Sequence, residues 1–176
     1  MRALRMTVHR LRRALDDADV LRAASGGYRL SENVAVDVLG AEHAVAAIGR
    51  LPSLVDRDRH RLETVFAEFI APRPVARTES KWSRVRETAI ADVRHRVGLL
   101  LGEDALQRAL SLHAVETAEA LLRFDPLDEP AVELLVRGLI ATGDAPEARR
   151  RYRSYADALA AEHDAEPAFR LEPLFA

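Results

Sequence analysis

The sequence of 176 residues contains no cysteine, a single lysine and few aromatic side chains. The absence of cysteine excludes a disulfide framework, a cysteine-ligated zinc site, an iron–sulfur cluster and a thiol nucleophile. Because aromatics are only 5% of the residues, the core must consist mostly of leucine, valine and alanine, which favours helix over sheet. The formal net charge is −2, so any contact with nucleic acid must come from a local basic patch.

Long apolar runs are also missing. No stretch approaches the roughly 18 to 20 residues that a membrane-spanning helix needs. The N-terminal stretch is basic and amphipathic, as in a transit peptide, but it lacks the continuous apolar segment of a secretory signal. We therefore expect a soluble protein of the cytoplasm with no membrane partner.

The N-terminal segment Met1–Leu15 predicts a helix with one apolar face and a strongly basic remainder. The segment holds five arginines and no acidic residue. Its apolar residues recur at spacings of 4, 3 and 4, which places them on one side of a helix: Leu4, Val8, Leu11 and Leu15.

The next residues predict extended structure. Val20–Ala24 and Tyr28–Leu30 suit two short strands, and Ser25-Gly26-Gly27 suits the turn between them, since glycine tolerates a positive φ. Val34–Val38 predicts a third extended piece.

From residue 39 onward the pattern predicts helices only, over residues 39–49, 56–70, 80–101, 104–123, 129–142 and 145–162. Gly143 suits the end of one helix and Asp144 the beginning of the next. Trp82 is expected to be a buried anchor, and the tail at Leu174–Phe175 to dock on the helices. Four acidic residues are interpreted as helix-start residues rather than as catalytic groups: Asp56, Asp58, Glu103 and Asp104.

A weak internal repeat supports a helical-repeat architecture. At one common spacing, Ala114 aligns with Ala148, and Ala118 with Tyr152. Small residues at such positions let paired helices approach closely. The spacing matches the period of tetratricopeptide helical hairpins, which is about 34 residues. The predicted fold is therefore mainly α, with tetratricopeptide-like helices after an N-terminal helix and hairpin.

Two parts of the sequence resemble known families. Ala3–Leu15 resembles the recognition helix of the response-regulator type of winged helix, and Gly26–Leu30 resembles its wing hairpin. The remainder resembles the bacterial transcriptional activator domain of Streptomyces antibiotic regulatory proteins. The residues that carry this second resemblance are Trp82, Ala118, Leu121, Leu122, Asp125, Pro126, Leu127, Glu129, Leu135, Leu139, Gly143, Asp144, Ala148, Tyr152, Leu159 and Pro167.

The resemblance implies two domains and a transcriptional regulator. Residues 1–38 would be a partial winged helix-turn-helix, and residues 39–176 the helical activator domain. The implied partners are duplex DNA, RNA polymerase or another protein, and a second copy in a homodimer. The implied DNA-contacting residues are Arg5, Thr7, His9, Arg10, Arg12 and Arg13 on the helix, with Arg29 on the wing.

Within that set we favour Arg5, His9 and Arg12 over Arg10. A helix fits the major groove, and the planar fork of arginine can hold a guanine edge or a phosphate. If about four of these side chains meet phosphates, the log–log dependence of affinity on salt should have a slope of about −3.6.

A complete winged helix of this type begins with a small sheet and two further helices, whereas Met1 already lies within the expected recognition helix. The apolar stripe then needs another partner surface. We hypothesise that it docks on the first helices of residues 39–176; pairing with a second copy, mobility, or a true start upstream are the alternatives.

Motifs of enzymatic chemistry are missing from the sequence. No phosphate-binding glycine loop, HExxH pair or GxSxG elbow occurs, so we expect no catalytic residues, no metal and no cofactor. The cluster Arg149-Arg150-Arg151 with Arg153 is interpreted as a solvated helix face rather than a second DNA site. The second functional hypothesis is a helical protein-interaction module that has lost DNA binding.

Overall fold

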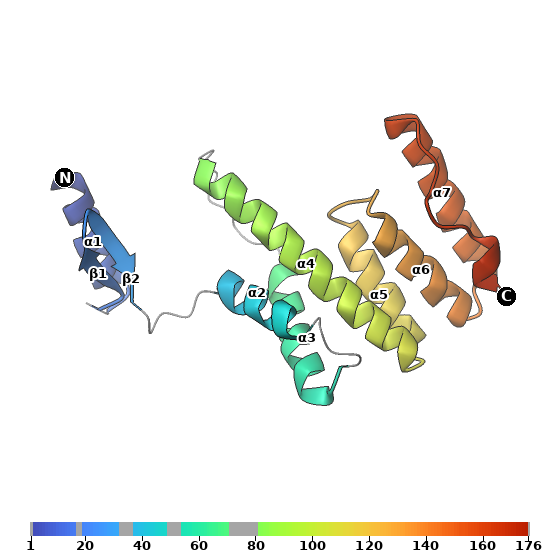
Figure 1. Ribbon diagram of the computed structural model, residues 1–176, viewed down its shortest axis with the longest axis horizontal. Helices are drawn as coiled ribbons and strands as arrows, with labels where there is room; N and C mark the ends of the chain where they lie inside the picture. The colour runs from blue at the N-terminus through green and yellow to red at the C-terminus, as the bar shows by residue number, and fades with distance from the viewer. Residues whose placement is uncertain (1, 17–18, 32–36, 49–53, 71–80, 176) are drawn as a thin grey trace. The chain divides into compact units, whose positions relative to one another are not determined.

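The computed structural model describes residues 2–16, 19–31, 37–48, 54–70 and 81–175 (Figure 1). The chain divides into two units, Met1–Gly40 and Ala41–Ala176. The predicted mainly helical fold with a small sheet near the N-terminus is confirmed. Among the described residues, no helix is long and apolar enough to cross a membrane.

The first unit consists mainly of one helix and one hairpin, as predicted. Helix α1 (Arg2–Ala14) precedes strands β1 (Leu21–Ala24) and β2 (Gly27–Leu30), which pair antiparallel with Leu21 opposite Leu30. Gly26 has a φ of 82° in the turn between the strands, a conformation that side chains other than glycine rarely adopt.

The predicted third extended piece is wrong where the structure tests it. Asp37 and Val38 form the beginning of helix α2 (Asp37–Ile48), and residues 34–36 lie outside the described residues. A short run of valines separated by small residues fits a helix as well as a strand, so periodicity alone cannot decide between them.

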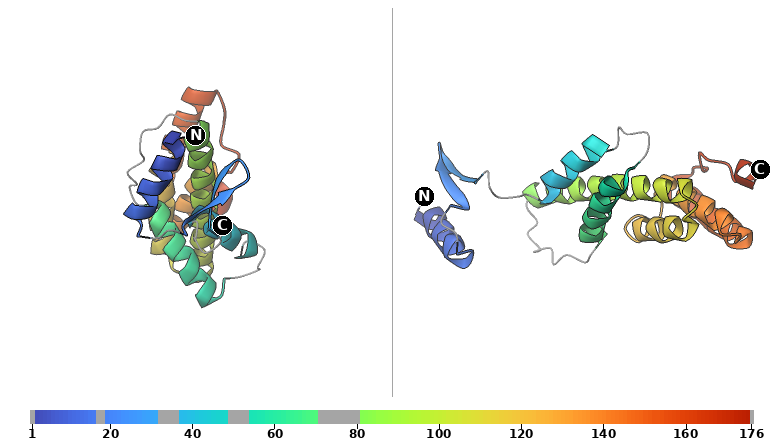
Figure 2. Two further views of the ribbon diagram at one scale, coloured as in Figure 1. Left: turned by 90° about the vertical axis from the view of Figure 1, so that its left-hand side faces the viewer. Right: turned by 90° about the horizontal axis from the view of Figure 1, so that it is seen from below.

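The second unit is a series of helices. After α2 come α3 (Asp56–Ile70), α4 (Lys81–Gln107), α5 (Ser111–Leu122), α6 (Glu129–Ala141) and α7 (Ala145–His163), and the short 3₁₀ helix η1 (Glu172–Phe175) ends the chain. Helix α4 packs on α3, α5 and α6, and α6 packs on α5 and α7. Figure 2 shows the same succession of helices along the unit from α3 to α7.

The predicted division of the long helix was misplaced. We expected a break between residues 101 and 104, but α4 continues to Gln107, and the break falls at Ala109, which has a φ of 57°. Glu103 and Asp104 are therefore inside α4 rather than at a helix start, whereas Asp56 and Asp58 do lie in the first turn of α3 as predicted. Gly102 lies inside α4, and Leu134 of α6 occupies the space that a side chain at this position would fill.

Small residues at the repeat positions form the helix contacts. Ala114, Ala118 and Ala148 are completely buried, as the repeat spacing predicted. Leu134 and Leu135 of α6, each 1% exposed, fill the centre of the same core.

The helix caps and the tail also follow the sequence. Gly143 adopts a φ of 87°, and the Asp144 side chain accepts a hydrogen bond of 3.2 Å from the Glu147 amide. Leu174 is half-buried against the core, which confirms that the C-terminal tail docks on the helices. The side chain of Trp82, predicted to be an anchor, lies outside the described residues.

Gly102→Ala should lower the free energy of unfolding by about 1–3 kcal/mol, because the new methyl group would overlap the Leu134 side chain in a packed core. Gly40→Ala, in helix α2, is the matched control. An added β-carbon there meets nothing within 4 Å, so the helix should be unchanged or gain up to about 1 kcal/mol. Urea unfolding measures both, and equal stability of the two variants would contradict the packing argument.

Candidate functional site

The predicted DNA-contacting side chains of α1 are mostly exposed. The helix has no acidic residue in its sequence and carries Arg12 and Arg13 in its last turn, where positive charge is favourable. Five of the six predicted side chains on this helix are exposed: Arg5, Thr7, His9, Arg10 and Arg13. The Thr7 hydroxyl donates a hydrogen bond of 3.1 Å to the Ala3 carbonyl, so it is turned back onto its own helix.

Arg12 is placed differently from the other predicted contacts. Its guanidinium donates a hydrogen bond to the Leu21 carbonyl oxygen of β1, and its Cζ lies 6.0 Å from the centre of the Tyr28 ring. The side chain is half-buried and connects α1 to the hairpin. Its Nε is buried and has no hydrogen-bond partner within the described part of the chain. In this structure Arg12 therefore positions the hairpin, and its contact with DNA remains a prediction.

The hairpin adds Arg22, an arginine that the sequence analysis missed. The strand register places Arg22 of β1 directly opposite the predicted residue Arg29 of β2, and both are exposed. Because neighbouring side chains alternate between the faces of a strand, both arginines lie on the face opposite Tyr28. Two like charges directly opposite each other in this register are unfavourable to each other. The sequence could have indicated Arg22, because a two-residue turn at Ser25-Gly26 pairs Arg22 with Arg29 across the hairpin.

The apolar stripe of α1 is largely uncovered within the first unit. Val8 is 5% exposed, but Leu4, Leu11 and Leu15 are 52%, 42% and 52% exposed. The hypothesis that the stripe docks on the helices of the later part of the chain remains a prediction.

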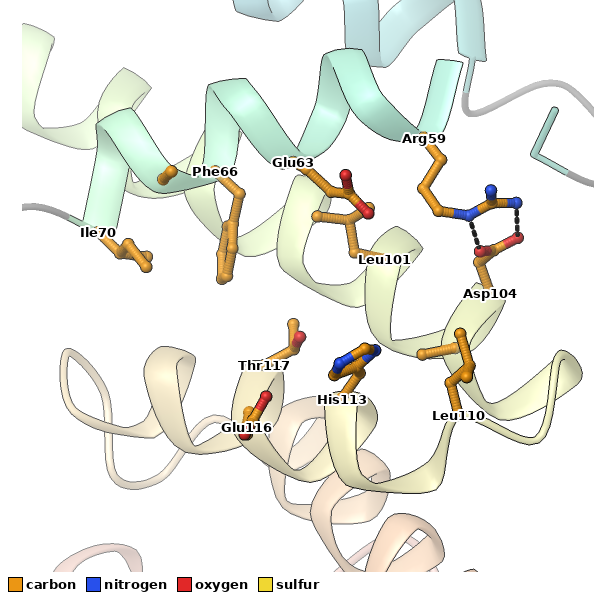
Figure 3. Close-up of a pocket in the computed structure, with 12 residues that line it drawn as sticks. Arg59, Glu63, Phe66, Ile70, Leu101, Asp104, Leu110, His113, Glu116 and Thr117 are labelled. Carbon is orange, nitrogen blue, oxygen red and sulfur yellow. Dashed lines mark hydrogen bonds and ion pairs between the residues drawn. The ribbon is translucent and has the colours of Figure 1, made fainter. Parts of the chain in front are cut away.

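In the second unit, α3, α4 and α5 enclose a pocket of about 270 Å³ (Figure 3). Phe66 and Ile70 come from α3, Leu101 from the floor formed by α4, and Leu110 from the turn before α5. Two carboxylates, Glu63 on α3 and Glu116 on α5, lie among these apolar side chains (Figure 3).

A buried ion pair fixes one end of this pocket. The Arg59 Nε donates to Asp104 Oδ2 at 2.6 Å, and a second nitrogen reaches the Leu54 carbonyl oxygen at 3.1 Å. Asp104 and Asp56 stabilise the charged guanidinium through hydrogen bonds and raise the pKa of Arg59 well above its usual range. Hydrogen bonds from Arg59 and Arg108 lower the pKa of the exposed Asp56. This network holds α3 against α4 beside the pocket.

The arginines of α7 are used within the helical unit. Arg150 donates to Glu147 at 2.6 Å, and Arg151 is paired with both Glu119 of α5 and Glu147. Arg153 donates to the Arg149 carbonyl oxygen at 3.3 Å. These contacts agree with a solvated face carrying ion pairs.

Another pocket lies between the loop after α5 and the C-terminal half of α7, and Tyr155 is among its lining residues. Tyr155 is 5% exposed, and burial, together with nearby carboxylates such as Glu129, raises the pKa of its phenol. The ring stacks on Phe169 of the tail with centroids 6.4 Å apart.

In the helical unit, α4 packs on α5, α5 on α6, and α6 on α7. Residues 36–176 match the bacterial transcriptional activator domain, and the chain belongs to this family. The resemblance that we inferred from the sequence is thereby confirmed for the helical part. Residues 1–35 lie outside the match, so the winged-helix interpretation remains a prediction. No curated protein and no solved structure matches the chain.

Arg12→Ala should loosen the hairpin, because it removes a charged hydrogen bond and a cation–π contact. Amide hydrogen exchange of residues 21–30 should become faster by about tenfold or more. The exposed Arg13→Ala is the control and should leave exchange unchanged. If Arg12→Ala exchanges like the natural protein, Arg12 does not position the hairpin.

Asp104→Ala should lower the free energy of unfolding by about 2–3 kcal/mol, because Arg59 then keeps only Asp56, a backbone carbonyl and water as partners for its charge. Asp56→Ala serves as the control and should have almost no effect, since the Asp56 side chain is 89% exposed. Chemical unfolding of both variants is the measurement. Similar losses from the two variants would show that the buried pair is unimportant.

Proposed function

We propose that this protein is a transcriptional regulator that contacts promoter DNA through α1 and the β1–β2 hairpin. The helical unit would contact a second subunit or RNA polymerase. Membership of the bacterial transcriptional activator domain family supports a role in transcription. Both this function and the alternative below are binding functions without catalysis. A DNA-bound regulator of this kind would act in the cytoplasm, with the chromosome.

The observation that carries the proposal is the exposed basic surface of the first unit. His9, Arg10 and Arg13 are exposed on α1, which has no acidic residue to neutralise them. At about 100° per residue, Arg13 lies on the side of the helix away from the leucine stripe, and His9 and Arg10 lie between that side and the stripe. A helix with such a face can enter the major groove, where arginine reaches guanine edges or phosphates.

The hairpin would supply a second point of contact beside the helix. Arg22 and Arg29 are cross-strand neighbours, so one backbone phosphate could lie between two guanidinium groups. A helix in the groove with a hairpin on the backbone would fix the register of the protein on the duplex.

Fluorescence anisotropy with mixed-sequence duplex DNA at low salt tests the proposal on the full chain. We expect salt-sensitive binding with a log–log slope of about −3.6 if about four phosphates are neutralised. The double variant Arg13→Ala/Arg22→Ala should weaken binding and make the slope shallower by about 1.8, which corresponds to two lost contacts.

The matched control is Arg57→Ala/Arg61→Ala, which removes two exposed arginines from α3. It should bind DNA like the natural protein. Absence of binding at low salt, or equal losses in the two double variants, would refute DNA contact through the first unit.

The second candidate is a protein-interaction module without DNA binding. The observation in its favour is the exposed leucine stripe of α1, since apolar side chains of this size on one face are typical of protein interfaces rather than of phosphate contacts. The anisotropy experiment separates the two candidates, because the interaction module predicts no binding even at low salt.

A further inference from the structure

The leucine stripe of α1 requires a covering surface. Leu4, Leu11 and Leu15 are all exposed, and Val8 is the one buried member of the stripe. A helix of 13 residues and a hairpin of two short strands are both marginally stable alone in water. Covering the stripe would therefore stabilise the unit as well as remove apolar surface from water.

The pocket between α3 and α5 has the complementary properties (Figure 3). Its walls are mostly apolar, with Phe66, Leu101 and Leu110 facing the space, and it remains open at the surface. The pocket has a volume of about 270 Å³ and is open to solvent, so side chains of another helix can enter it.

The electrostatics of the two surfaces are opposite. Arg59, the only arginine or lysine that lines the described pocket, is already paired with Asp104 and Asp56. The other carboxylates of the pocket are Glu63, which lies 3.7 Å from His60 Nδ1, and Glu116; with neutral histidines they give the pocket a negative character. On α1, which has five arginines and no acid, Arg5 and Arg10 flank the leucine stripe about 100° to either side of Leu4 and Leu11.

We propose that α1 of one copy inserts its leucine stripe into the α3–α5 pocket of a second copy. Leu4 and Leu11 enter the apolar space, and Arg5 and Arg10 reach the carboxylates of Glu63 and Glu116. Each chain carries both halves of this contact, so a reciprocal exchange closes a two-fold dimer and leaves no exposed half unfilled.

The contact uses Arg10 of the proposed DNA-binding surface but leaves the other basic side chains of that surface outside it. Arg13 lies on the side of α1 away from the stripe, and Arg22 lies on the hairpin face opposite Tyr28. Both remain outside the contact between the copies. A dimer built in this way would present two basic helices, but its formation does not depend on DNA binding.

Sedimentation velocity over a range of protein concentrations tests the inference on the full chain. We expect a monomer–dimer equilibrium that high salt weakens. Leu4→Glu/Leu11→Glu should weaken dimerisation by more than about a hundredfold, because two buried leucines are replaced by charges. Glu63→Arg/Glu116→Arg should weaken it by at least about tenfold through charge repulsion.

A charge-swapped protein provides the decisive comparison. Combining Arg5→Glu/Arg10→Glu with Glu63→Arg/Glu116→Arg should restore the dimer, although each pair of substitutions alone disrupts it. The controls are Met6→Glu, at an exposed position off the stripe, and Glu162→Lys, exposed on α7. Both should dimerise like the natural protein, and circular dichroism should show unchanged helix content in all variants.

A natural protein that stays monomeric at every concentration, or a dimer that the leucine and glutamate variants leave intact, would overturn the inference. So would a charge-swapped protein that fails to recover. Anisotropy on the Glu63→Arg/Glu116→Arg variant keeps the two proposals apart, because this variant retains every basic side chain of the first unit. Loss of the dimer with DNA binding retained is the result that both proposals predict. A variant that still dimerises but binds DNA would refute the dimer contact alone, and a natural protein that dimerises without binding DNA would refute the proposed function alone.

Discussion

Close packing around helix α4 is the constraint on which the helical unit depends. Two glycines of this helix face the side chains of its neighbours. An added β-carbon at Gly98 would lie 2.7 Å from a Leu121 methyl group and 2.8 Å from the Phe66 ring, and at Gly102 it would overlap Leu134. Helices α3, α5 and α6 therefore approach one helix at positions where its side chains are absent. A helix interior normally disfavours glycine by about 1 kcal/mol relative to alanine, and the contacts made across these positions offset that cost.

Polar contacts then set the orientation of the packed helices. The Arg59–Asp104 pair holds α3 to α4, and Asp128 accepts a hydrogen bond of 3.2 Å as the cap of α6 while its other oxygen lies 2.6 Å from the His95 ring of α4. Arg94 of α4 covers the Phe124 ring at 3.6 Å, beside the loop between α5 and α6. Helix α4 thus makes polar contacts with α3 and with the beginning of α6.

The first unit has a much smaller core than the helical unit, among the residues that the structure describes. Among its described residues Val8 and Ser31 are buried, and Arg12 supplies the polar link from helix to hairpin. Most of the α1 surface is exposed, including both the basic side chains and the leucine stripe. The helix therefore carries two exposed surfaces of different chemistry, one basic and one apolar.

Local sequence signals were enough for most element types, for the caps at Gly143 and Asp144, and for the small buried residues of α5 and α7, because hydrophobic period and capping chemistry act within a few residues. They were not enough for the start of α2, which we expected to be extended. Nor were they enough for the length of α4. Gly102 and Asp104 resemble a helix boundary locally, whereas Leu134 and Arg59, distant in the sequence, make them interior positions. The same holds for the basic residues, since composition identified α1 as the basic helix but only the fold assigned Arg12 to the hairpin and placed Arg22 beside Arg29. Composition and period determine what each segment can form, and contacts between distant segments decide which side chains are buried or paired and which remain on the surface.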